Sequence, residues 1–435
     1  MLVAFVKKPV KGMQDFLPSD MRLRESVISM IKESYARYGF MQIETPVMEH
    51  LSNLQSKQGG DNEKLIFQIL KRGRALEKGA QAVGECDDGR EAAAKIRAAC
   101  SDSGLRYDLT LPLSRYYANN KEELPNPFKT LQIGSVWRAD NPQKGRFRQF
   151  TQCDIDILGD DSILAEIELV SATSDMLKKI LEPCKVEGLT VHVNDRSILK
   201  AAALKAGFDE EAIGSVLITL DKFDKIGFDG VAAELVDRGF DADMVERYVS
   251  LYRDYDPKID CKEFCSELGE YLEDGVSASL DEIIACAKTL VGDGVSIVFD
   301  PTLVRGMGYY TGPIFEVSVD GYGFSIAGGG RYDKMIGKFC GEDVCAVGFS
   351  IGFERIITIL KDFGVGSALS DSGATVFLLD KKVTLEKKME IFAKARDLRA
   401  EGKIASVQPL KKNAKRQISA LEAQGFTDFE KVYAD

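Results

Sequence analysis

Hydrophobic and polar positions follow two different periods along the first half of the chain. Apolar residues recur at helical spacing over residues 20–37 and 161–181, which predicts two amphipathic helices. Residues 131–137 are largely apolar and β-prone, so we expect a strand there. Over residues 146–156, polar side chains fall at every second position. Since alternate residues of a strand share one face, we expect a second strand with one charged and polar face.

The pattern changes twice in the second half of the chain. Residues 195–290 are mostly helical by pattern, and we interpret them as a helical subdomain inserted into a main domain that spans 1–365. A glycine- and serine-rich linker is expected at 366–373, and strands and helices then alternate over 374–435, as in a small α/β domain. The apolar residues of its first helix are expected to face inward: Leu385, Met389 and Phe392.

Composition narrows the classes of function. The formal net charge of -11 over 435 residues argues against a surface coated in basic residues for nucleic acid, although it allows a local basic patch. No apolar run is long enough to span a membrane, and no secretion signal is recognisable. The 9 cysteines lack the spacing of zinc sites, which favours free thiols in a cytoplasmic protein. With only His50 and His192 present, a histidine-based acid–base mechanism is poorly supported.

The polar strand and the turn before it contain a candidate phosphate and base site. Arg138, Arg146 and Arg148 supply guanidinium groups, and Phe150 and two aspartates follow them. Guanidinium groups bind phosphate oxygens bidentately, and an aromatic face stacks on a base. The pattern therefore fits a triphosphate and purine site whose aspartates hold a cationic or hydrogen-bonding substrate. A solvated sheet face is the alternative interpretation.

A second group of candidate residues comes from the last part of the main domain. Arg305 is followed by glycines and by the pair Tyr309 and Tyr310, between two expected strands. Three consecutive glycines precede Tyr332, and a run of small residues precedes Arg355. A β-turn with core tyrosines and a tight glycine turn are the alternative interpretations of the first two segments.

Together these segments resemble the three class II motifs and the two histidine motifs of histidyl-tRNA synthetases, a class II aminoacyl-tRNA synthetase family. The resemblance covers nearly the whole chain. It implies an α+β fold: a class II antiparallel sheet flanked by helices, a helical insertion at about 195–290 and a small C-terminal α/β domain that is similar to a shortened anticodon-binding domain. The helix over 20–37 and the strand after it resemble motif 1, which implies a homodimer.

The resemblance also implies roles for individual residues. Arg138 and Arg305 would be the catalytic residues, acting on the α-phosphate. ATP would be bound by residues of motifs 2 and 3: Arg138, Asp140, Arg146, Phe150 and Arg355. Histidine would be bound by residues from four segments: Asp108, Thr110, Gln152, Asp156, Arg305, Tyr309, Tyr310 and Tyr332. Asp108 and Thr110 are expected to share one face of a strand. Mg²⁺ would bridge phosphate oxygens, and among protein ligands Glu316 is a candidate.

The implied function is ATP-dependent activation of histidine to histidyl-adenylate and transfer to the 3′ end of tRNA(His). The alternative is a catalytically inactive paralogue that acts as the regulatory subunit of ATP phosphoribosyltransferase in histidine biosynthesis. Such chains lose catalytic arginines and the C-terminal domain, whereas this chain keeps Arg138, Arg305, Arg355 and part of the last domain.

Three features depart from the family pattern. Asp140 stands where motif 2 commonly has Glu, and Gly308 stands where many members have Asp before the paired tyrosines. The last domain ends at Asp435, soon after its third expected strand. Its candidate basic patch lies at the start of its second helix: Lys411, Lys412, Lys415 and Arg416. A solvated helix start explains these basic residues equally well, so anticodon recognition would depend on a shortened domain.

Overall fold

The computed structural model divides the chain into two compact units. The first unit is Met1–Met13 with Ile31–Ile356, and the second is Gln14–Met30 with Ile357–Asp435. The expected linker at 366–373 lies, except for its last residue, outside the part of the chain that the structure describes, as does Gly308. The described residues are 5–55, 65–83, 88–142, 146–186, 188–253, 260–305, 309–365 and 373–434.

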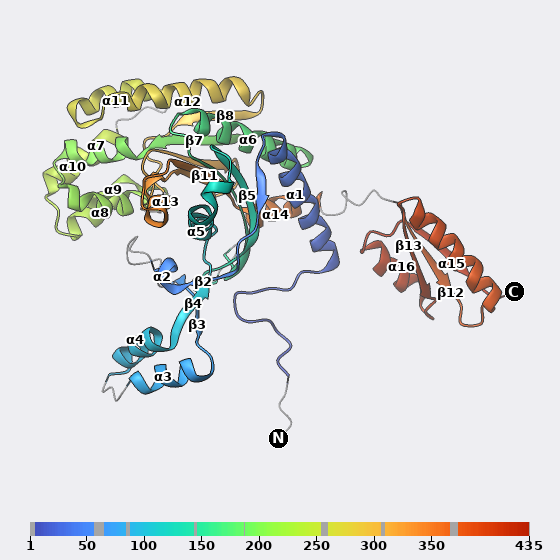
Figure 1. Cartoon of the computed structure of the whole chain (residues 1–435). Helices are drawn as coiled ribbons and strands as arrows, with labels where there is room; N and C mark the ends of the chain where they lie inside the picture. Colours follow the sequence, from blue (N-terminus) through green and yellow to red (C-terminus); the bar gives the residue numbers. More distant parts are fainter. Residues whose placement is uncertain are drawn as a thin grey trace. The chain divides into compact units, whose positions relative to one another are not determined.

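An eight-stranded sheet is the centre of the first unit, with the strand order β1-β5-β6-β11-β10-β9-β7-β8 (Figure 1). All neighbours from β5 to β7 are antiparallel, as the resemblance implied. β1 and β8 pair in parallel at the two edges, so the complete sheet is mixed. The strands are β1 Met41–Ile43, β5 Phe128–Trp137, β6 Gln149–Leu158, β7 Leu189–Asp195, β8 Val295–Phe299, β9 Pro313–Val319, β10 Ala327–Arg331 and β11 Ala346–Ile351.

The two strands expected from the first half of the chain form the hairpin of β5 and β6. They pair along their whole length, and β6 begins at Gln149, slightly later than expected. On its other side β6 pairs with β11, which places Asp154 opposite Ser350 and Asp156 opposite Gly348. The polar residues in this part of β6 are almost fully buried, with Gln152, Asp154 and Asp156 only 6%, 4% and 3% exposed, so they do not form a solvated sheet face.

Helices cover the sheet and supply its hydrophobic core. α6 forms in the predicted segment and completely buries Leu169, Val170 and Leu177. The first predicted helix also forms, as α1, and its Tyr35 shares a hydrogen bond of 3.2 Å with Thr173 of α6. Two helices, α1 Pro18–Arg37 and α14 Phe353–Asp362, belong partly to each unit. The others that flank the sheet are α5 Thr110–Asn120, α6 Leu164–Leu181, α12 Val276–Leu290 and α13 Asp333–Cys340.

A smaller antiparallel sheet, with the order β2-β4-β3, carries three short helices (Figure 1). α3 and α4 pack closely because Gly79 has no side chain: a Cβ there would lie 2.5 Å from the backbone oxygen of Ala99. Its elements are β2 Met48–His50, α2 Leu51–Leu54, β3 Gln68–Leu70, α3 Gly73–Val83, α4 Gly89–Cys100 and β4 Ser101–Leu105.

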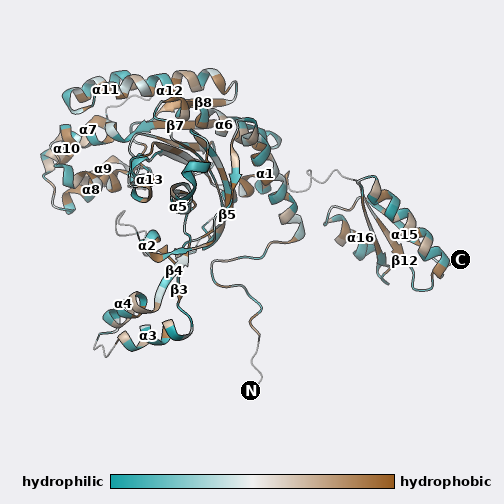
Figure 2. Cartoon of the chain, viewed as in Figure 1, coloured by the Kyte–Doolittle hydropathy of each residue, from teal (hydrophilic) through white to brown (hydrophobic). Residues whose placement is uncertain are grey.

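The segment with helical periodicity forms consecutive helices between β7 and β8. Aromatic rings hold them together: Phe208 lies edge-on to Tyr248, with ring centres 5.5 Å apart, and Tyr248 lies edge-on to Tyr252 at 5.2 Å. Figure 2 shows the strongly hydrophobic residues of α8 in this group. The role of the segment as an inserted subdomain stays a prediction. Its helices, besides α12, are α7 Arg196–Ala206, α8 Glu210–Leu220, α9 Phe223–Asp237, α10 Ala242–Arg253 and α11 Cys261–Leu268.

The C-terminal part of the second unit contains a three-stranded parallel sheet with the order β13-β12-β14. Its strands and helices alternate as the sequence pattern predicted. Phe377, Ile391 and Ala395 are fully or almost fully buried in its core. Its elements are β12 Ala374–Leu379, α15 Leu385–Ala400, β13 Ile404–Pro409, α16 Ala414–Glu422 and β14 Asp428–Val432.

The prediction that the first apolar row of α15 faces inward is wrong. Leu385, Met389 and Phe392 are 72%, 65% and 54% exposed. α15 has a second apolar row, with Ile391 and Ala395, and only that row packs on the sheet, because three strands cover a single face of the helix. In Figure 2, α15 accordingly mixes hydrophilic and hydrophobic residues along its length.

None of the helices in the described ranges combines the length and the apolar composition that crossing a membrane requires.

Candidate active site

The predicted site residues come together at one cavity of about 390 Å³, built mainly on β6, β10 and β11. This volume lies in the range of pockets that bind small molecules. The cavity lining includes every residue to which the resemblance assigned the binding of ATP or histidine: Asp108, Thr110, Arg138, Asp140, Arg146, Phe150, Gln152, Asp156, Arg305, Tyr309, Tyr310, Tyr332 and Arg355. Segments up to about 250 residues apart in sequence thus contribute to one site, while the individual roles of these residues stay predictions.

The prediction that Asp108 and Thr110 share a strand face is wrong. β4 ends at Leu105, and Thr110 is the first residue of α5. Asp108 precedes the helix, and its Oδ1 accepts a hydrogen bond of 3.3 Å from the backbone N–H of Leu111. A polar side chain that caps the first turn favours helix over strand here, and Pro112 is tolerated because it lies in the first turn. Both residues still line the cavity.

Four guanidinium groups make one part of the cavity strongly cationic. Arg138 is oriented by a hydrogen bond of 2.9 Å from its Nε to the backbone oxygen of Tyr107. Burial lowers the pKa of the Arg355 guanidinium, and although Glu316 opposes this, the positive charges of Arg146, Arg305 and Arg138 lower that pKa further. Clustered arginines repel one another, so the site is suited to a ligand with several negative charges.

Aromatic rings lie beside two of these arginines. The guanidinium carbon of Arg138 is 5.1 Å from the ring centre of Phe150, and that of Arg355 is 5.5 Å from the ring centre of Phe324. Arg355 also donates from Nη1 to the backbone oxygen of Ser325 at 2.5 Å. Phe150 and Arg355, two of the residues that the resemblance assigns to ATP binding, both line the cavity.

Arg148, which the sequence pattern placed with the other arginines, is not among the cavity residues. It precedes β6, so the alternation of strand faces does not extend to it. Its Nε donates to the backbone oxygen of Asp140 at 2.9 Å, and its backbone N–H donates to the oxygen of Gly12 at 2.8 Å. Arg148 therefore supports the loop that carries Asp140.

The other part of the cavity is rich in buried carboxylates. Burial is the main reason why the pKa of Asp108 is raised to about 6 and that of Asp154 to about 7. Arg138 opposes the shift at Asp108, while hydrogen bonds from Ser350 and Gln152 oppose it at Asp154. Carboxylates that are partly protonated near neutral pH favour a ligand that brings its own positive charge.

Asp156 lies deepest in this carboxylate group. Burial and the neighbouring Asp154 raise its pKa well above the usual value. Its Oδ1 accepts a hydrogen bond of 2.5 Å from the hydroxyl of Tyr332. Its other oxygen, Oδ2, and Oδ1 of Asp154 are buried and have no hydrogen-bond partner among the described residues. The same is true of Gln152 Oε1 and Arg305 Nε. Since buried polar atoms are normally satisfied, these four atoms are candidates to contact a ligand.

Tyrosine rings surround the carboxylates. Tyr309 and Tyr310 have ring centres 4.7 Å apart, and Tyr309 lies edge-on to Tyr332 at 6.0 Å. Tyr310 is 8% exposed and Tyr332 only 2% exposed. Their hydroxyl groups provide donors and acceptors in an otherwise apolar wall, which suits a polar aromatic ring of limited size.

Glycines allow the strands under the cavity to approach its functional groups. A Cβ at Gly348 would lie 2.0 Å from Oδ1 of Asp156, and a Cβ at Gly328 would lie 2.5 Å from Nη1 of Arg305. A Cβ at Gly329 would lie 1.9 Å from the backbone oxygen of Gly348. The glycine run is therefore required by close packing in β10, not by a tight turn.

Asp154 lines the cavity. The alternation along β6 placed it with Gln152 and Asp156 on one face, and the sequence pattern gave both aspartates a cationic or hydrogen-bonding substrate, although the resemblance assigned histidine binding to Asp156 alone. Its hydrogen bond of 2.6 Å from Nε2 of Gln152 joins Asp154 to a predicted histidine-binding residue. Ser350, directly opposite on β11, also lines the cavity and could not have been found without the pairing of the strands.

Two other predicted features lie beside the cavity. Glu316 makes an ion pair of 2.5 Å with Arg305. His192, one of the two histidines of the chain, lies on β7 and contacts Asp300 at 3.0 Å and Ser318 at 2.9 Å. Among the described residues, no group of three or more His, Cys, Asp or Glu side chains could hold a metal ion. The cysteines in the described part of the chain are all free thiols.

Comparison with known proteins identifies the family of the chain. A family model described as Histidyl-tRNA synthetase matches residues 98–356. A histidine–tRNA ligase of Leifsonia xyli is 41% identical over 434 residues, covering 98% of this chain and 95% of that protein. A histidine–tRNA ligase of Porphyromonas gingivalis is 34% identical, covering 95% of this chain and 89% of that protein.

Solved structures show the same fold. The histidyl-tRNA synthetase of Nostoc sp. PCC 7120 superposes with a TM-score of 0.75 at 26% identity, covering 97% of this chain and 90% of that one. A structure from Bacillus halodurans, titled as an ATP phosphoribosyltransferase regulatory subunit/histidyl-tRNA synthetase, has a TM-score of 0.74 but only 19% identity, with 99% of this chain and 100% of that one covered. It therefore supports the fold alone. The family match and the identity over almost the whole length show that the chain belongs to the histidyl-tRNA synthetase family.

Proposed function

We propose that the protein activates L-histidine with ATP, giving histidyl-adenylate and pyrophosphate, and transfers the histidyl group to the 3′ end of tRNA(His). The observation that carries this proposal is the union, in one cavity, of Arg138, Arg305 and Arg355 with Asp156. Arginines suit the phosphates of ATP, and buried carboxylates and tyrosines suit the ammonium and imidazole of histidine. The curated relatives at 41% and 34% identity are named for the same activity.

The first step is an in-line displacement at the α-phosphorus. A carboxylate oxygen of histidine forms the new P–O bond, and the bond to the bridging oxygen breaks, so that pyrophosphate leaves. Arg138 and Arg305 would hold the α-phosphate, and Arg146 and Arg355 the outer phosphates. Negative charge shifts toward the leaving pyrophosphate, so fixed guanidinium groups stabilise the transition state, and positioning supplies much of the remaining rate.

The second step consumes the adenylate. A ribose hydroxyl of the terminal tRNA nucleotide attacks the activated carbonyl carbon, its proton is lost, and AMP leaves with the electron pair of the broken bond. No histidine side chain of the protein lines the cavity in its described part. We therefore propose that the proton passes to a phosphate oxygen or to water rather than to a protein imidazole.

Recognition of histidine would use both ends of the amino acid. Asp108 and Thr110 would hold the α-ammonium, together with Gln152. Tyr310 and Asp156 would contact the two imidazole nitrogens, with Tyr332 orienting Asp156 through its hydrogen bond of 2.5 Å. A site with buried polar groups on both sides of the ring rejects amino acids that cannot satisfy them.

Mg²⁺ is proposed to enter with ATP, whose charge it would neutralise. Mg²⁺ commonly uses phosphate oxygens and water with only one or two protein carboxylates, so the lack of a larger carboxylate cluster in the described residues is compatible with it. Glu316 is the candidate carboxylate, because its side chain is 30% exposed and lies beside Arg305, which would hold the α-phosphate; Oε2 now pairs with Arg305 at 2.5 Å, so Mg²⁺ would use the other oxygen.

We also propose that the protein is a homodimer. The edge strand β1 and the segment from Val47 into β2 leave apolar side chains exposed, with Met41 at 43%, Val47 at 45% and Met48 at 52%. Met41 lies in the strand after α1 that resembles part of the dimer-forming motif 1, and Val47 and Met48 come shortly after that strand. Sedimentation velocity is expected to give about twice the chain mass of 47.9 kDa. Met41→Glu with Met48→Glu should shift the protein toward monomer, and a wild-type monomer at micromolar concentration would refute the proposal.

The cytoplasmic location stays a prediction, and so does anticodon recognition by the last domain. The regulatory-subunit function is not better supported than the enzyme. Its structural counterpart shares the fold at 19% identity, whereas the arginines that catalysis needs are present and line the cavity here.

The test of the proposed function is histidine-dependent ATP–pyrophosphate exchange. Wild-type protein is expected to exchange with histidine and with no other amino acid. Arg305→Ala should lose on the order of 10²–10³-fold in rate, because it removes a charge that stabilises the transition state. Arg396→Ala is the matched control, since this arginine lies outside the cavity and its side chain is 75% exposed. A folded wild-type protein that binds histidine without exchange would refute the enzyme and favour the regulatory function.

A further inference from the structure

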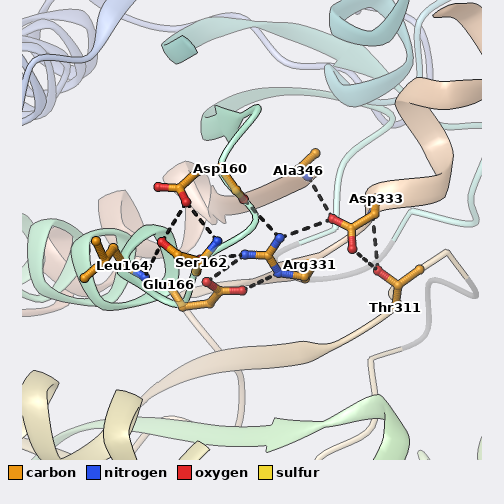
Figure 3. Close-up of polar contacts among 8 residues, drawn as sticks. All are labelled: Asp160, Ser162, Leu164, Glu166, Thr311, Arg331, Asp333 and Ala346. Atoms are coloured by element: carbon orange, nitrogen blue, oxygen red, sulfur yellow. Dashed lines mark hydrogen bonds and ion pairs between the residues drawn. The ribbon is translucent and has the colours of Figure 1, made fainter. Parts of the chain in front are cut away.

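A buried ion network adjoins the tyrosines of the cavity (Figure 3). Arg331 ends β10 and its side chain is 11% exposed, while Glu166, in the first turn of α6, is 1% exposed. The contact is bidentate: Nε of Arg331 donates to Oε1 at 2.6 Å, and Nη2 donates to Oε2 at 2.9 Å. Neither residue lines the cavity. Burying a charged pair is costly and is weak evidence for a gain in stability, so the network invites a functional explanation.

The remaining donors of Arg331 are used as well. Nη1 donates to the backbone oxygen of Asp160 at 3.2 Å and to Oδ1 of Asp333 at 3.3 Å. Nη2 donates to the backbone oxygen of Ser162 at 3.1 Å. Figure 3 shows these contacts converging on the one guanidinium group. Because its five donors form a rigid fork, Arg331 holds β10, the loop between β6 and α6, and the start of α13 in one arrangement.

Asp333 extends the network to Thr311, the residue that follows the pair Tyr309 and Tyr310. Its Oδ1 accepts from the backbone N–H of Ala346 at 2.9 Å, and its Oδ2 accepts from the hydroxyl of Thr311 at 3.3 Å. The backbone N–H of Asp333 donates to the Thr311 hydroxyl oxygen at 3.2 Å, and the N–H of Thr311 donates to the backbone oxygen of Arg331 at 2.8 Å. Thr311 directly follows Tyr310, so the network anchors that tyrosine from its C-terminal side.

The second tyrosine is held in the same way. Tyr332 lies between Arg331 and Asp333 in sequence, and its backbone N–H donates to the oxygen of Ala346 at 2.7 Å. Its hydroxyl reaches the cavity and donates to Asp156. The positions of Tyr310, which would contact imidazole, and of Tyr332, which would orient Asp156, therefore depend on residues that do not line the cavity.

We propose that Glu166, Arg331 and Asp333 act as positioning residues that set the placement of Tyr310 and Tyr332 and thereby the affinity and selectivity for the imidazole ring. This inference rests on the proposed function, because histidine is the ligand that the two tyrosines would contact. Displacements of about 1 Å in a bound geometry can cost about 10²-fold. Loosening the network should thus impair the histidine half of the site, while the arginines that bind ATP keep their own contacts.

Two variants loosen the network in different ways. Arg331→Lys keeps the positive charge but loses the fork, and Thr311→Val removes only the hydroxyl link to Asp333. In ATP–pyrophosphate exchange, the KM for histidine is expected to rise about tenfold in Arg331→Lys and severalfold in Thr311→Val, as for other outer-shell partners of a binding site. The KM for ATP should stay within about twofold. Both variants should also discriminate less well between histidine and a histidine analogue that is methylated on one imidazole nitrogen.

Glu168→Gln is the matched control. Glu168 lies on the same helix, two residues after Glu166, and makes an ion pair of 2.5 Å with Lys129 that does not involve the tyrosine segments. It should leave both KM values unchanged. A KM for histidine in Arg331→Lys that matches the control would overturn the positioning role, as would equal increases in both KM values, which would indicate general damage.

Failure of the two proposals can be told apart. If thermal unfolding shows that Arg331→Lys is not folded, Thr311→Val tests the positioning role. A raised KM for histidine in Thr311→Val supports that role, and a wild-type KM overturns it. If wild-type protein shows no exchange, the proposed function fails. Calorimetric titration of wild type and Thr311→Val with histidine then decides the positioning role by itself.

Discussion

At the scale of single residues, Asp154 shows how a buried carboxylate could depend on its ligand. Its pKa is raised to about 7 by burial, and hydrogen bonds from Ser350 and Gln152 only partly oppose that shift. At pH 8 the free site therefore contains an anion without a strong cationic partner, and the ammonium of histidine would supply one. At pH 6 most of the sites would hold a proton that the ammonium has to displace.

We accordingly expect the KM for histidine in pyrophosphate exchange to rise as the pH falls from 8 to 6. A single group with a pKa of about 7 predicts an increase of roughly tenfold at pH 6. Histidine itself titrates in this range, so the comparison with Asp154→Asn separates the two effects. The variant should have a higher KM at pH 8 and a flatter profile below it. Identical profiles in the two proteins would show that Asp154 does not contribute.

Asp154→Asn also carries its own control for folding. The folded-state pKa of Asp154 lies above the ordinary value of 3.8, so the folded protein holds the proton more tightly than the unfolded chain does. The stability that this group contributes is therefore present at low pH and lost as the pH rises through about 7. The uncharged variant should be at least as stable as wild type at pH 8, and impaired histidine binding there cannot be attributed to unfolding.

Residue patterns predicted part of the site well and part of it poorly. Gln152 and Asp156 could be assigned to one face because a strand alternates by backbone geometry alone. Thr110 was assigned to a strand because its short apolar neighbourhood fits either structure. The capping contact from Asp108 to Leu111 decides for a helix, and such a local hydrogen bond cannot be recognised from periodicity.

At the scale of elements, the neighbouring strands β10 and β11 each contain a glycine whose Cβ position is occupied, one by a side-chain atom and the other by a backbone atom. Gly348→Ala on the neighbouring β11 would place a methyl group 2.0 Å from Oδ1 of Asp156, a side-chain atom that can move. We expect the variant to fold and to raise the KM for histidine by about 10²-fold, since Asp156 is displaced from the imidazole. Gly329→Ala would instead meet the backbone oxygen of Gly348 at 1.9 Å.

Gly329→Ala should therefore lower the free energy of unfolding. A backbone obstacle cannot rotate away, and overpacking in a core typically costs about 1–3 kcal/mol. Thermal unfolding and exchange kinetics of the two variants separate these effects. Gly323→Ala is the control, because no atom lies within 4 Å of its Cβ position and its φ is not positive. If Gly348→Ala kept a wild-type KM for histidine, the placement of Asp156 against the imidazole would be wrong.

Element patterns also have a limit that α15 illustrates. Its helix was predicted correctly, but its inward face was not, because two apolar rows have the same period and differ only in position around the axis. Periodicity identifies a helix, whereas the choice between Leu385 and Ile391 as buried residue depends on which side the sheet covers. The same limit applies to the cavity, where Ser350 is placed by the pairing of β6 with β11 over a long sequence separation.

At the scale of the whole molecule, an acidic protein must still bind a polyanion if it charges tRNA. Its net charge of -11 makes the placement of local basic groups decisive. Lys411, Lys412, Lys415 and Arg416 are all exposed around the start of α16. Basic residues at a helix N-terminus oppose the helix dipole by about 0.3–1 kcal/mol each. A cluster in such an unfavourable place is better explained by an anionic partner than by the stability of the domain.

Lys411→Glu with Lys412→Glu is therefore expected to raise the KM for tRNA about tenfold in aminoacylation and to reduce its salt dependence, because fewer counterions are released on binding. Pyrophosphate exchange, which needs no tRNA, should be unchanged. Arg396→Glu with Lys403→Glu makes the same change in charge at exposed residues near the opposite end of the small sheet, where β13 begins, and should have a much smaller effect. Equal effects of the two pairs would mean that only net charge matters. No effect of the first pair would show that this domain does not contact tRNA through α16, and would favour the solvated helix start as the explanation of its basic residues.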